Sequence, residues 1–470
     1  MMTLLAAALA IVTLDQAPLR ASPRDSAQQQ VVLWQGDSLE VRGEKADYLQ
    51  VYDHRRERAG YVKASQVRQV SIEPDAAPES LAVVRFLRDT PGAEALGISY
   101  VATYLKAAPA EAIGAEVFDA MGVMAERLAK RASSRKAKQD DTVIAAHLEV
   151  VAYYGINIQS FERDGRVQLC YEGEAFRRVL GMDATSVQKA RAALAVTRQD
   201  CLDPAMTVSQ RVSIDAWRAE VMDKVALTDD LPEYLKNRVR MRRAGIWAAI
   251  AHQQARQDAD KSQAAAKRAL FELMGVNKME FTDEDNWAYT DAAIRVGASR
   301  WAAETLPVNK ANLSLVSRAG EPGETCVLLT DAKHSAENPL AKRCTYSQVW
   351  LASARVNSSA SALALAVQPM AGWRELWLFH RTENGWLIDV LPPAASDPEL
   401  GYVEFAGWVP ATDKFLVARE IKVDSRFKRS FDLVNIASLQ TEKSADKPEN
   451  LTAFYRWQDP QWKQQNLIIR

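Results

Sequence analysis

Residues 31–70, VVLWQGDSLEVRGEKADYLQVYDHRRERAGYVKASQVRQV, carry the pattern that decides the fold of the first part of this chain. Apolar and polar side chains alternate in LEVR (39–42) and in LQVY (49–52), so each run has one inward and one outward face. We therefore predict a small all-β barrel over residues 11–70. Glycine and acidic turn residues separate the short apolar runs, at Gly36-Asp37, Gly43-Glu44-Lys45 and Ala59-Gly60.

The order of these runs matches a known type of module. The stretch APLRASPRDSAQQQVVLWQGDSLEVRG (17–43) opens on a leucine-arginine strand, passes through a polar loop and reaches an apolar strand that ends in Gly-Asp. YLQVYD (48–53) and AGYV (59–62) then give an aromatic-x-x-Val strand and a Gly-aromatic-Val strand. In these features residues 11–70 resemble a bacterial SH3-like domain. The resemblance implies an N-terminal recognition module ahead of a larger body.

Aromatic residues of this module are the candidate ligand-binding residues. A barrel of about 60 residues is too small to bury every ring fully. Exposed rings offer stacking area to peptides or sugars. The alternative is that two or three of the rings fill the core. The candidates are Trp34, Tyr48, Tyr52 and Tyr61.

A change of period marks the next region. Residues 71–80, with two prolines, predict a linker. From residue 81 to about 310 the apolar positions recur with helical spacing, as in AEVFDAMGVMAERLAKRA. Short loops between successive helices predict an antiparallel helical array over 81–310. One β-hairpin interrupts it, with Asp164-Gly165 as the turn.

Strand patterns return over residues 311–470, where short apolar runs are bounded by turn residues. Two stretches, 353–368 and 406–420, resemble one another with an offset of 53 (410−357). They are weakly similar to hairpins of propeller blades that repeat Trp-x-Pro-Asp-Gly, of which Trp408 and Pro410 match. This region predicts an all-β domain, either a partial propeller or a sandwich. The chain as a whole is predicted to be a multidomain α+β protein.

The cysteines form two local pairs. Cys170 and Cys201 are 31 residues apart (201−170), and Cys326 and Cys344 are 18 apart (344−326). An even count in local pairs predicts two disulfides, Cys170–Cys201 and Cys326–Cys344, in an oxidising compartment. The alternative is four buried free thiols. Neither pair has the CxxC spacing of zinc or redox motifs, so we predict no metal site.

The first ten residues, MMTLLAAALA, predict an export signal. An apolar run ends in Ala8-Leu9-Ala10, which fits the small-x-small pattern before a signal-peptidase site. No basic residue precedes the run, so we interpret residues 1–10 as a truncated signal peptide. The alternative is an apolar N-terminus. No other segment approaches the roughly 18 apolar residues of a membrane span. We therefore expect an exported, periplasmic protein without a membrane span.

Charge and missing motifs limit the possible functions. Lys+Arg (59) and Asp+Glu (60) nearly balance, and a net charge of −1 argues against a nucleic-acid binder. There is no HExxH, GxSxG elbow or glycine-rich phosphate loop, so no catalytic residue and no cofactor is predicted. We expect a non-enzymatic binding or scaffold protein of the bacterial cell envelope, whose module recognises cell-wall peptide or a protein partner. The alternative is an envelope hydrolase without a recognisable motif.

Overall fold

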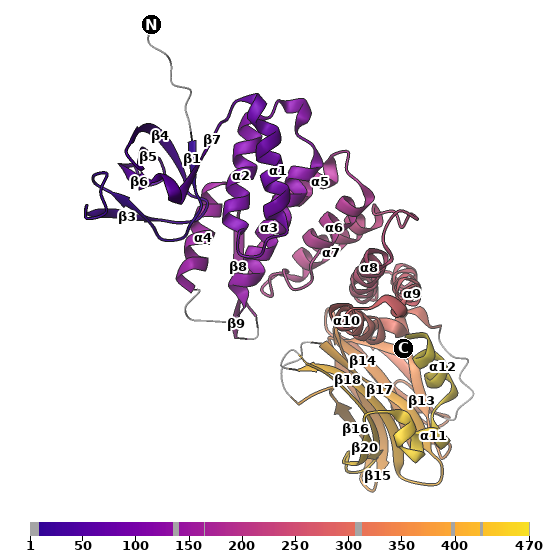
Figure 1. The fold of residues 1–470 in the computed structure, drawn as a ribbon. Coiled ribbons are helices and arrows are strands. Elements are labelled where there is room, and N and C mark those ends of the chain that lie inside the picture. Colours follow the sequence, from indigo (N-terminus) through magenta and orange to yellow (C-terminus); the bar gives the residue numbers. More distant parts are fainter. Residues whose placement is uncertain are drawn as a thin grey trace. The chain divides into compact units, whose positions relative to one another are not determined.

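The computed structural model describes residues 9–134, 141–163, 165–305, 313–395, 400–423 and 426–469. The chain forms two compact units, an N-terminal unit (Met1–Met206) and a C-terminal unit (Thr207–Arg470). Helices and strands occur in both units, so the protein is of mixed α+β class (Figure 1). The boundary between the units lies inside the predicted helical domain, 81–310, whose helices are therefore divided between them.

An antiparallel sheet of seven strands begins the N-terminal unit, as the alternating pattern predicts. Its strand order is β3-β2-β6-β5-β4-β1-β7. Alternate residues such as Leu49, Val51 and Val62 point into one core, because side chains of a strand alternate between its faces. The strands are β1 (Leu9–Val12), β2 (Ala17–Arg20), β3 (Gln29–Leu33), β4 (Ser38–Lys45), β5 (Tyr48–Asp53), β6 (Arg58–Lys63) and β7 (Val67–Val70).

The first strand overlaps the predicted signal peptide. Residues 1–8 lie outside the described residues. Leu9 and Ala10 belong to β1, which pairs with both β4 and β7. Ala10 is fully buried in the core of the sheet. A cut after Ala10 would therefore remove two residues of a strand that lies inside the sheet.

Helices and one hairpin complete the N-terminal unit. Helix α1 begins at Ala77, inside the segment predicted as a linker. Pro78 is compatible with the first turn of a helix, because the N–H groups of that turn have no partner within the helix. The predicted hairpin is present, although Asp164 of its turn lies outside the described residues. The elements are α1 (Ala77–Arg88), α2 (Glu94–Ala107), α3 (Ala115–Ser133), α4 (Asp141–Tyr153), β8 (Ile158–Arg163), β9 (Arg166–Tyr171), α5 (Glu174–Gly181) and α6 (Ser186–Val196).

The sheet and the helices of this unit are joined through the turn before β4. Gly36 there has φ +93°, and its carbonyl oxygen accepts a hydrogen bond of 2.7 Å from the Tyr154 hydroxyl. His147 of α4 contacts Asp15, with 2.8 Å between Nε2 and Oδ1. The core cluster of the helices includes Ile11 of β1. The sheet is therefore packed against the helices rather than tethered to them.

A buried carboxylate holds α2 and α3 together. Glu94 begins α2 and accepts hydrogen bonds from the Gly92 N–H (3.1 Å) and from Nε of Arg127 (2.6 Å), and it also pairs with Arg131. Burial alone would raise the pKa of Glu94. The hydrogen bonds lower the pKa by more than burial raises it, so the net pKa lies below its usual value of 4.5. The folded state therefore favours the ionised form.

We expect this carboxylate to make the N-terminal unit acid-sensitive. Because the folded pKa is depressed, its stabilisation is complete above the unfolded pKa and is lost as the pH falls through the folded value. The free energy of unfolding, measured with urea, should fall less between pH 7 and pH 3 for Glu94→Gln than for the wild type. Glu116→Gln is the matched control, since Glu116 pairs with Arg85 at 2.6 Å but is about half exposed and screened by water. If Glu94→Gln and Glu116→Gln alter this pH dependence equally, the acid sensitivity does not come from the buried Glu94 carboxylate.

Helices also begin the C-terminal unit. Thr207 and Thr282 start two of them through capping boxes, in which the threonine hydroxyl and a side chain three residues later each accept a backbone N–H. These helices are α7 (Val208–Asp223), α8 (Glu233–Gln254), α9 (Ala259–Met274) and α10 (Asp283–Ser299), followed by a short 3-10 helix η5 (Arg300–Ala303).

The strands that follow form two successive up-and-down meanders in one sheet. The second meander begins 52 residues after the first (from Gln348 to Leu400), so the offset of 53 inferred from the sequence joins equivalent hairpins. A parallel pairing of Trp373 with Gly401 links the meanders. The strands are β13 (Gln348–Val356), β14 (Ala362–Met370), β15 (Trp373–Thr382), β16 (Gly385–Leu391), β17 (Leu400–Val409), β18 (Lys414–Val423), β19 (Arg426–Asn435) and β20 (Thr441–Ala445).

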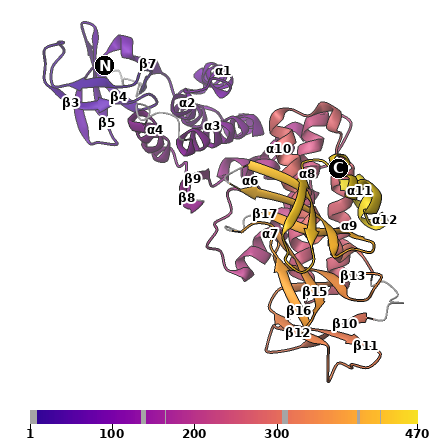
Figure 2. The same cartoon turned by 90° about the horizontal axis from the view of Figure 1, so that it is seen from below.

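A smaller sheet and two further helices cover this large sheet. The three-stranded sheet of β10 (Leu313–Ala319), β11 (Thr325–Asp331) and β12 (Ala341–Thr345) shares a core with β14 and β15. Figure 2 shows β12 close to β16. Both meanders contribute to a second core, and α10, α11 (Thr452–Trp457) and α12 (Pro460–Ile469) pack on the other face of β17. Layers on both faces explain why β17 is apolar almost throughout. The described strands of this unit close into no barrel.

Candidate functional site

The structure confirms both predicted cysteine pairs. Cys170 at the end of β9 is bonded to Cys201, and Cys326 of β11 is bonded to Cys344 of β12. Two disulfides fit a protein that leaves the reducing cytosol. Among the described residues, we find no helix with the length and apolar composition that a membrane crossing requires.

Two of the four candidate aromatic residues are already engaged by other residues of the N-terminal unit. Trp34 is partly buried and packs against the helical core of the N-terminal unit. Tyr48 is buried, and its hydroxyl donates a hydrogen bond of 2.6 Å to Asp25. For the Trp34 ring the alternative interpretation, core filling, fits the contacts. Tyr48 lies opposite Lys63, on the side of β5 that also carries Tyr52.

The other two candidates, Tyr52 and Tyr61, lie half-buried on the outer face of the sheet. In the pairing of β5 with β6, Tyr52 is opposite Ala59 and Tyr61 is opposite Gln50. The two tyrosines are thus diagonal neighbours, for which the separation is about 7–8 Å. We call Tyr52, Tyr61 and their charged neighbours the tyrosine face.

Charged side chains hold Tyr52 in place at one end of the tyrosine face. The Arg42 guanidinium lies 4.1 Å from the centre of the Tyr52 ring, within cation–π range. Glu40 pairs with Nε of Arg42 at 3.0 Å and with Nε2 of His54 at 2.6 Å. Hydrogen bonds from Arg42 and then from His54 lower the pKa of Glu40. The carboxylate therefore keeps the cation over the ring.

A second ion pair borders the face near Tyr61. Lys63, two residues further along β6 and so on the same side, is 2.8 Å from Asp25. Hydrogen bonds from Lys63 and then from Tyr48 lower the pKa of Asp25, and the same carboxylate raises the pKa of Lys63. The tyrosine face is thus an aromatic pair bordered by charges of both signs.

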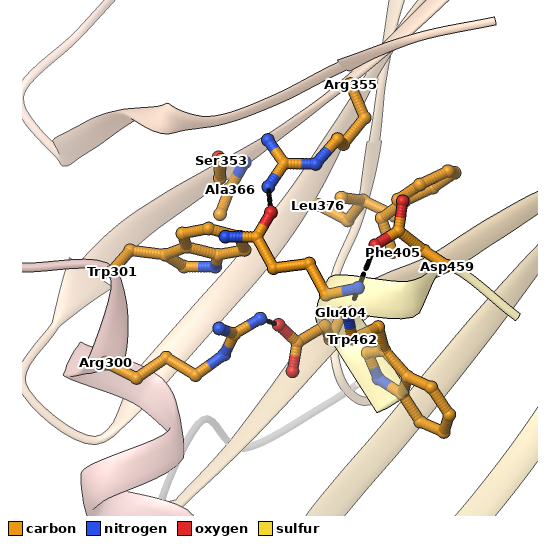
Figure 3. Close-up of a pocket in the computed structure, with 11 residues that line it drawn as sticks. Arg300, Trp301, Ser353, Arg355, Ala366, Leu376, Glu404, Phe405, Asp459 and Trp462 are labelled. Atoms are coloured by element: carbon orange, nitrogen blue, oxygen red, sulfur yellow. Dashed lines mark hydrogen bonds and ion pairs between the residues drawn. The ribbon is translucent and has the colours of Figure 1, made fainter. Parts of the chain in front are cut away.

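The C-terminal unit contains a small cavity that both polar and apolar side chains line, shown in Figure 3. Its volume is about 10 Å³ for the centre of a water-sized sphere, which is close to the room that one water molecule needs. The Gln461 N–H donates a hydrogen bond of 2.9 Å to Asp459. Polar side chains of η5, β13, β17 and α12, and of the residue just before α12, line part of the cavity. They are Arg300, Ser353, Arg355, Glu404, Gln461 and Asp459.

Two buried arginines converge on one carboxylate beside this cavity. Arg300 pairs with Glu404, and Nη2 of Arg374 lies 3.4 Å from Oε2 of the same glutamate. Nη1 of Arg374 also donates to the Gly297 carbonyl, at 2.5 Å, where α10 ends. Burial lowers the pKa of Arg374 to about 10, and burial together with the charge of Arg374 lowers the pKa of Arg300. We call Arg300, Arg374 and Glu404 the buried charge cluster.

The sequence interpretation did not identify this cluster. Its signal is a charged residue inside a run that is apolar on both sides, as Glu404 is in GYVEFAGW. A charge in such a run must be paired when it is buried. With room for about one water molecule, the cavity supports a structural role for the cluster better than the binding of an organic substrate.

Comparisons of this chain with protein-family models, with curated proteins and with solved structures find no match.

Proposed function

We propose that this chain is an exported, non-enzymatic binding protein of the bacterial cell envelope, located in the periplasm. Its N-terminal sheet is an SH3-like recognition module. The ligand is a peptide, either the peptide of the cell wall or an extended segment of a protein partner, and it lies across the tyrosine face. The observation that carries this proposal is the pair of half-buried tyrosines on the outer face of β5 and β6.

The spacing of the two rings suits an extended peptide. Alternate side chains of an extended chain lie about 6.6–6.8 Å apart on one side. This is close to the separation of about 7–8 Å expected for diagonal neighbours such as Tyr52 and Tyr61. Arg42 and Lys63 flank the rings, with Glu40 and Asp25 beside them. Both signs of charge are therefore within reach of the amino and carboxyl groups of a peptide.

The small cavity of the C-terminal unit favours a binding function over a hydrolytic one. A hydrolase needs a cleft that admits substrate beside groups able to transfer protons. The two carboxylates of this cavity are already engaged: Glu404 with arginines, and Asp459 with the N–H of Gln461. No observation on the described residues favours the hydrolase alternative.

We expect Tyr52→Ala combined with Tyr61→Ala to weaken binding of the purified protein to insoluble peptidoglycan by about ten-fold or more, because stacking on each ring contributes about 1 kcal/mol. Co-sedimentation over a range of protein concentrations measures the change. Phe86→Ala is the matched control, because Phe86 on α1 is an exposed ring, 74% accessible, outside the tyrosine face.

Trp34 is excluded from this test because its ring packs on the helices, and its removal would confuse binding with folding. Circular dichroism verifies that the double variant is folded. Binding of the folded double variant as tight as that of Phe86→Ala would contradict the proposal for cell-wall peptide. The double variant and Phe86→Ala are then compared for their capture of periplasmic proteins. This comparison tests whether the ligand is a segment of a protein partner.

A further inference from the structure

Three side chains with metal-binding atoms meet on one face of the small sheet β10–β12. Cys326 of β11 is directly opposite Cys344 of β12 in the strand pairing. Glu324 precedes Cys326 by two residues and so points to the same face. One carboxylate oxygen and the two sulfur atoms all lie within 4.8 Å of one another. We call these residues the Cys-Cys-Glu cluster.

A glycine turn keeps space beside the Cys-Cys-Glu cluster. The Gly320 N–H donates to the Glu324 carbonyl at 3.1 Å, and the Glu321 N–H donates to Oε2 of Glu324 at 3.1 Å. A Cβ at position 320 would collide with Oε2 of Glu324 and lie 3.0 Å from Sγ of Cys326. The turn therefore both orients the carboxylate and needs glycine for its approach to the sulfur.

We propose that reduction of the Cys326–Cys344 disulfide turns this cluster into a site for a thiophilic divalent cation, with Zn²⁺ as the type ion. A dithiol reductant supplies two electrons and two protons, which break the S–S bond and leave two thiols. The cation then displaces both thiol protons and binds two thiolates and the Glu324 carboxylate. A water molecule completes four-fold coordination. Two sulfur donors and one carboxylate oxygen are ligands that zinc accepts in proteins.

Strand pairing prepares the site before any metal arrives. β11 and β12 pair over five consecutive positions, from Thr325 with Thr345 to Leu329 with Ala341. Backbone hydrogen bonds of this ladder, and not the disulfide alone, keep the two cysteines opposite one another. β12 is the edge strand of the sheet, and Cys344 is only partly buried, which gives a reductant access to the sulfur.

The other disulfide supplies an internal comparison. Cys170–Cys201 joins β9 to the loop after α6 and lies in the N-terminal unit. In the part of the chain that the structure describes, only the Cys-Cys-Glu cluster brings three potential ligands together around a cysteine pair. Reduction of Cys170–Cys201 should therefore yield thiols without a comparable metal site.

The test uses Co²⁺ as a spectroscopic substitute for Zn²⁺ on the full-length protein. The oxidised protein and protein reduced with a phosphine are titrated with Co²⁺ under anaerobic conditions. Thiolate-to-cobalt charge-transfer absorption is expected in the reduced protein alone, and one equivalent of Zn²⁺ should abolish it. Thiols are counted in parallel. If Cys326 and Cys344 resist reduction in the folded protein, or if the reduced protein shows no such absorption, the proposal is wrong.

Two variants separate this site from general thiol binding. Glu324→Gln keeps the disulfide and removes the anionic ligand, and we expect the dissociation constant for Co²⁺ to rise about ten-fold or more. Cys170→Ser with Cys201→Ser leaves the cluster intact, and we expect the absorption and affinity to be unchanged. Unchanged affinity in Glu324→Gln, or loss of the signal in the folded double serine variant, would overturn the assignment.

Discussion

Glu404→Ala is expected to lower the free energy of unfolding of the C-terminal unit by about 3–5 kcal/mol, because it leaves buried arginine charges without their carboxylate. Arg374 is fully buried and Arg300 is 4% exposed, so bulk solvent screens their charges little. The carbonyls at the end of α10 would still accept from Arg374. Arg300 would lose its ion pair with Glu404.

Tryptophan fluorescence during urea unfolding measures this effect in the right unit. Trp34 is the only one of the twelve tryptophans in the N-terminal unit, so the signal reports almost entirely on the C-terminal one. Glu442→Ala is the matched control. Glu442 pairs with Lys414 at 2.5 Å, but both side chains are about one-third exposed, and such pairs contribute about 0–1 kcal/mol.

A second variant separates charge from shape. Glu404→Gln keeps the size of the side chain and can still accept a hydrogen bond, but it removes the negative charge. A loss close to that of Glu404→Ala identifies the unpaired arginine charges as the cause. If neither variant costs more than Glu442→Ala, the cluster does not stabilise the fold through its charges.

Local patterns in the sequence were sufficient for most secondary structure. Alternation in LQVY (49–52) correctly predicts a strand with an inner and an outer face, because a half-buried strand must alternate. The matched stretches 353–368 and 406–420 form equivalent hairpins, since each carries its own turn between apolar runs. These patterns depend on neighbouring residues only, so the strands and hairpins can be predicted without knowledge of the tertiary structure.

The division of the chain depends on contacts between distant residues and was not predicted. Trp301, after α10, shares a core cluster with Trp350 of β13 and Ala366 of β14. These contacts place α8–α10 in one unit with the large sheet. The helical period of the sequence shows that a helix buries one face, but it does not show which partner covers that face.

The candidate sites show the same limit at single residues. The sequence identifies Trp34 and Tyr52 alike as aromatic, yet one packs on helices and the other lies on the outer face. Charge in a strand usually indicates a solvent face, so the sequence pattern alone does not show that Glu404 is buried. For the Cys-Cys-Glu cluster a signal was present: Glu324 and Cys326 are two residues apart and hence on one face. Cys344 joins them only through the strand pairing.

Gly36→Ala is expected to lower the free energy of unfolding of the N-terminal unit by about 2–5 kcal/mol. A left-handed backbone costs about 1–2 kcal/mol for an alanine, and forcing an atom into a packed contact costs a further 1–3 kcal/mol or so. The new Cβ would lie 2.6 Å from the carbonyl oxygen of Ala95 in α2, which is backbone and cannot move aside alone. The turn would have to shift away from the helix.

Gly92→Ala is the control for the cost of placing an alanine in a left-handed backbone conformation. Gly92 has φ +91°, almost the value of Gly36, but nothing lies within 4 Å of a Cβ built there. The difference between the two variants therefore measures the contact between the turn and α2 alone. Hydrogen–deuterium exchange of peptides from β1–β7 and from α2–α3 detects which part opens.

Because the hydroxyl of Tyr154 and the backbone of Ala95 both meet the same turn, Gly36→Ala should loosen the sheet from the helices before either part unfolds. We expect faster exchange in β4 and in the Tyr154 segment, with α3 protected as in the wild type. Equal exchange in Gly36→Ala and Gly92→Ala would mean that the turn does not hold the two parts together. The sheet would then be a separable module, and the tyrosine face could be tested on residues 9–70 alone.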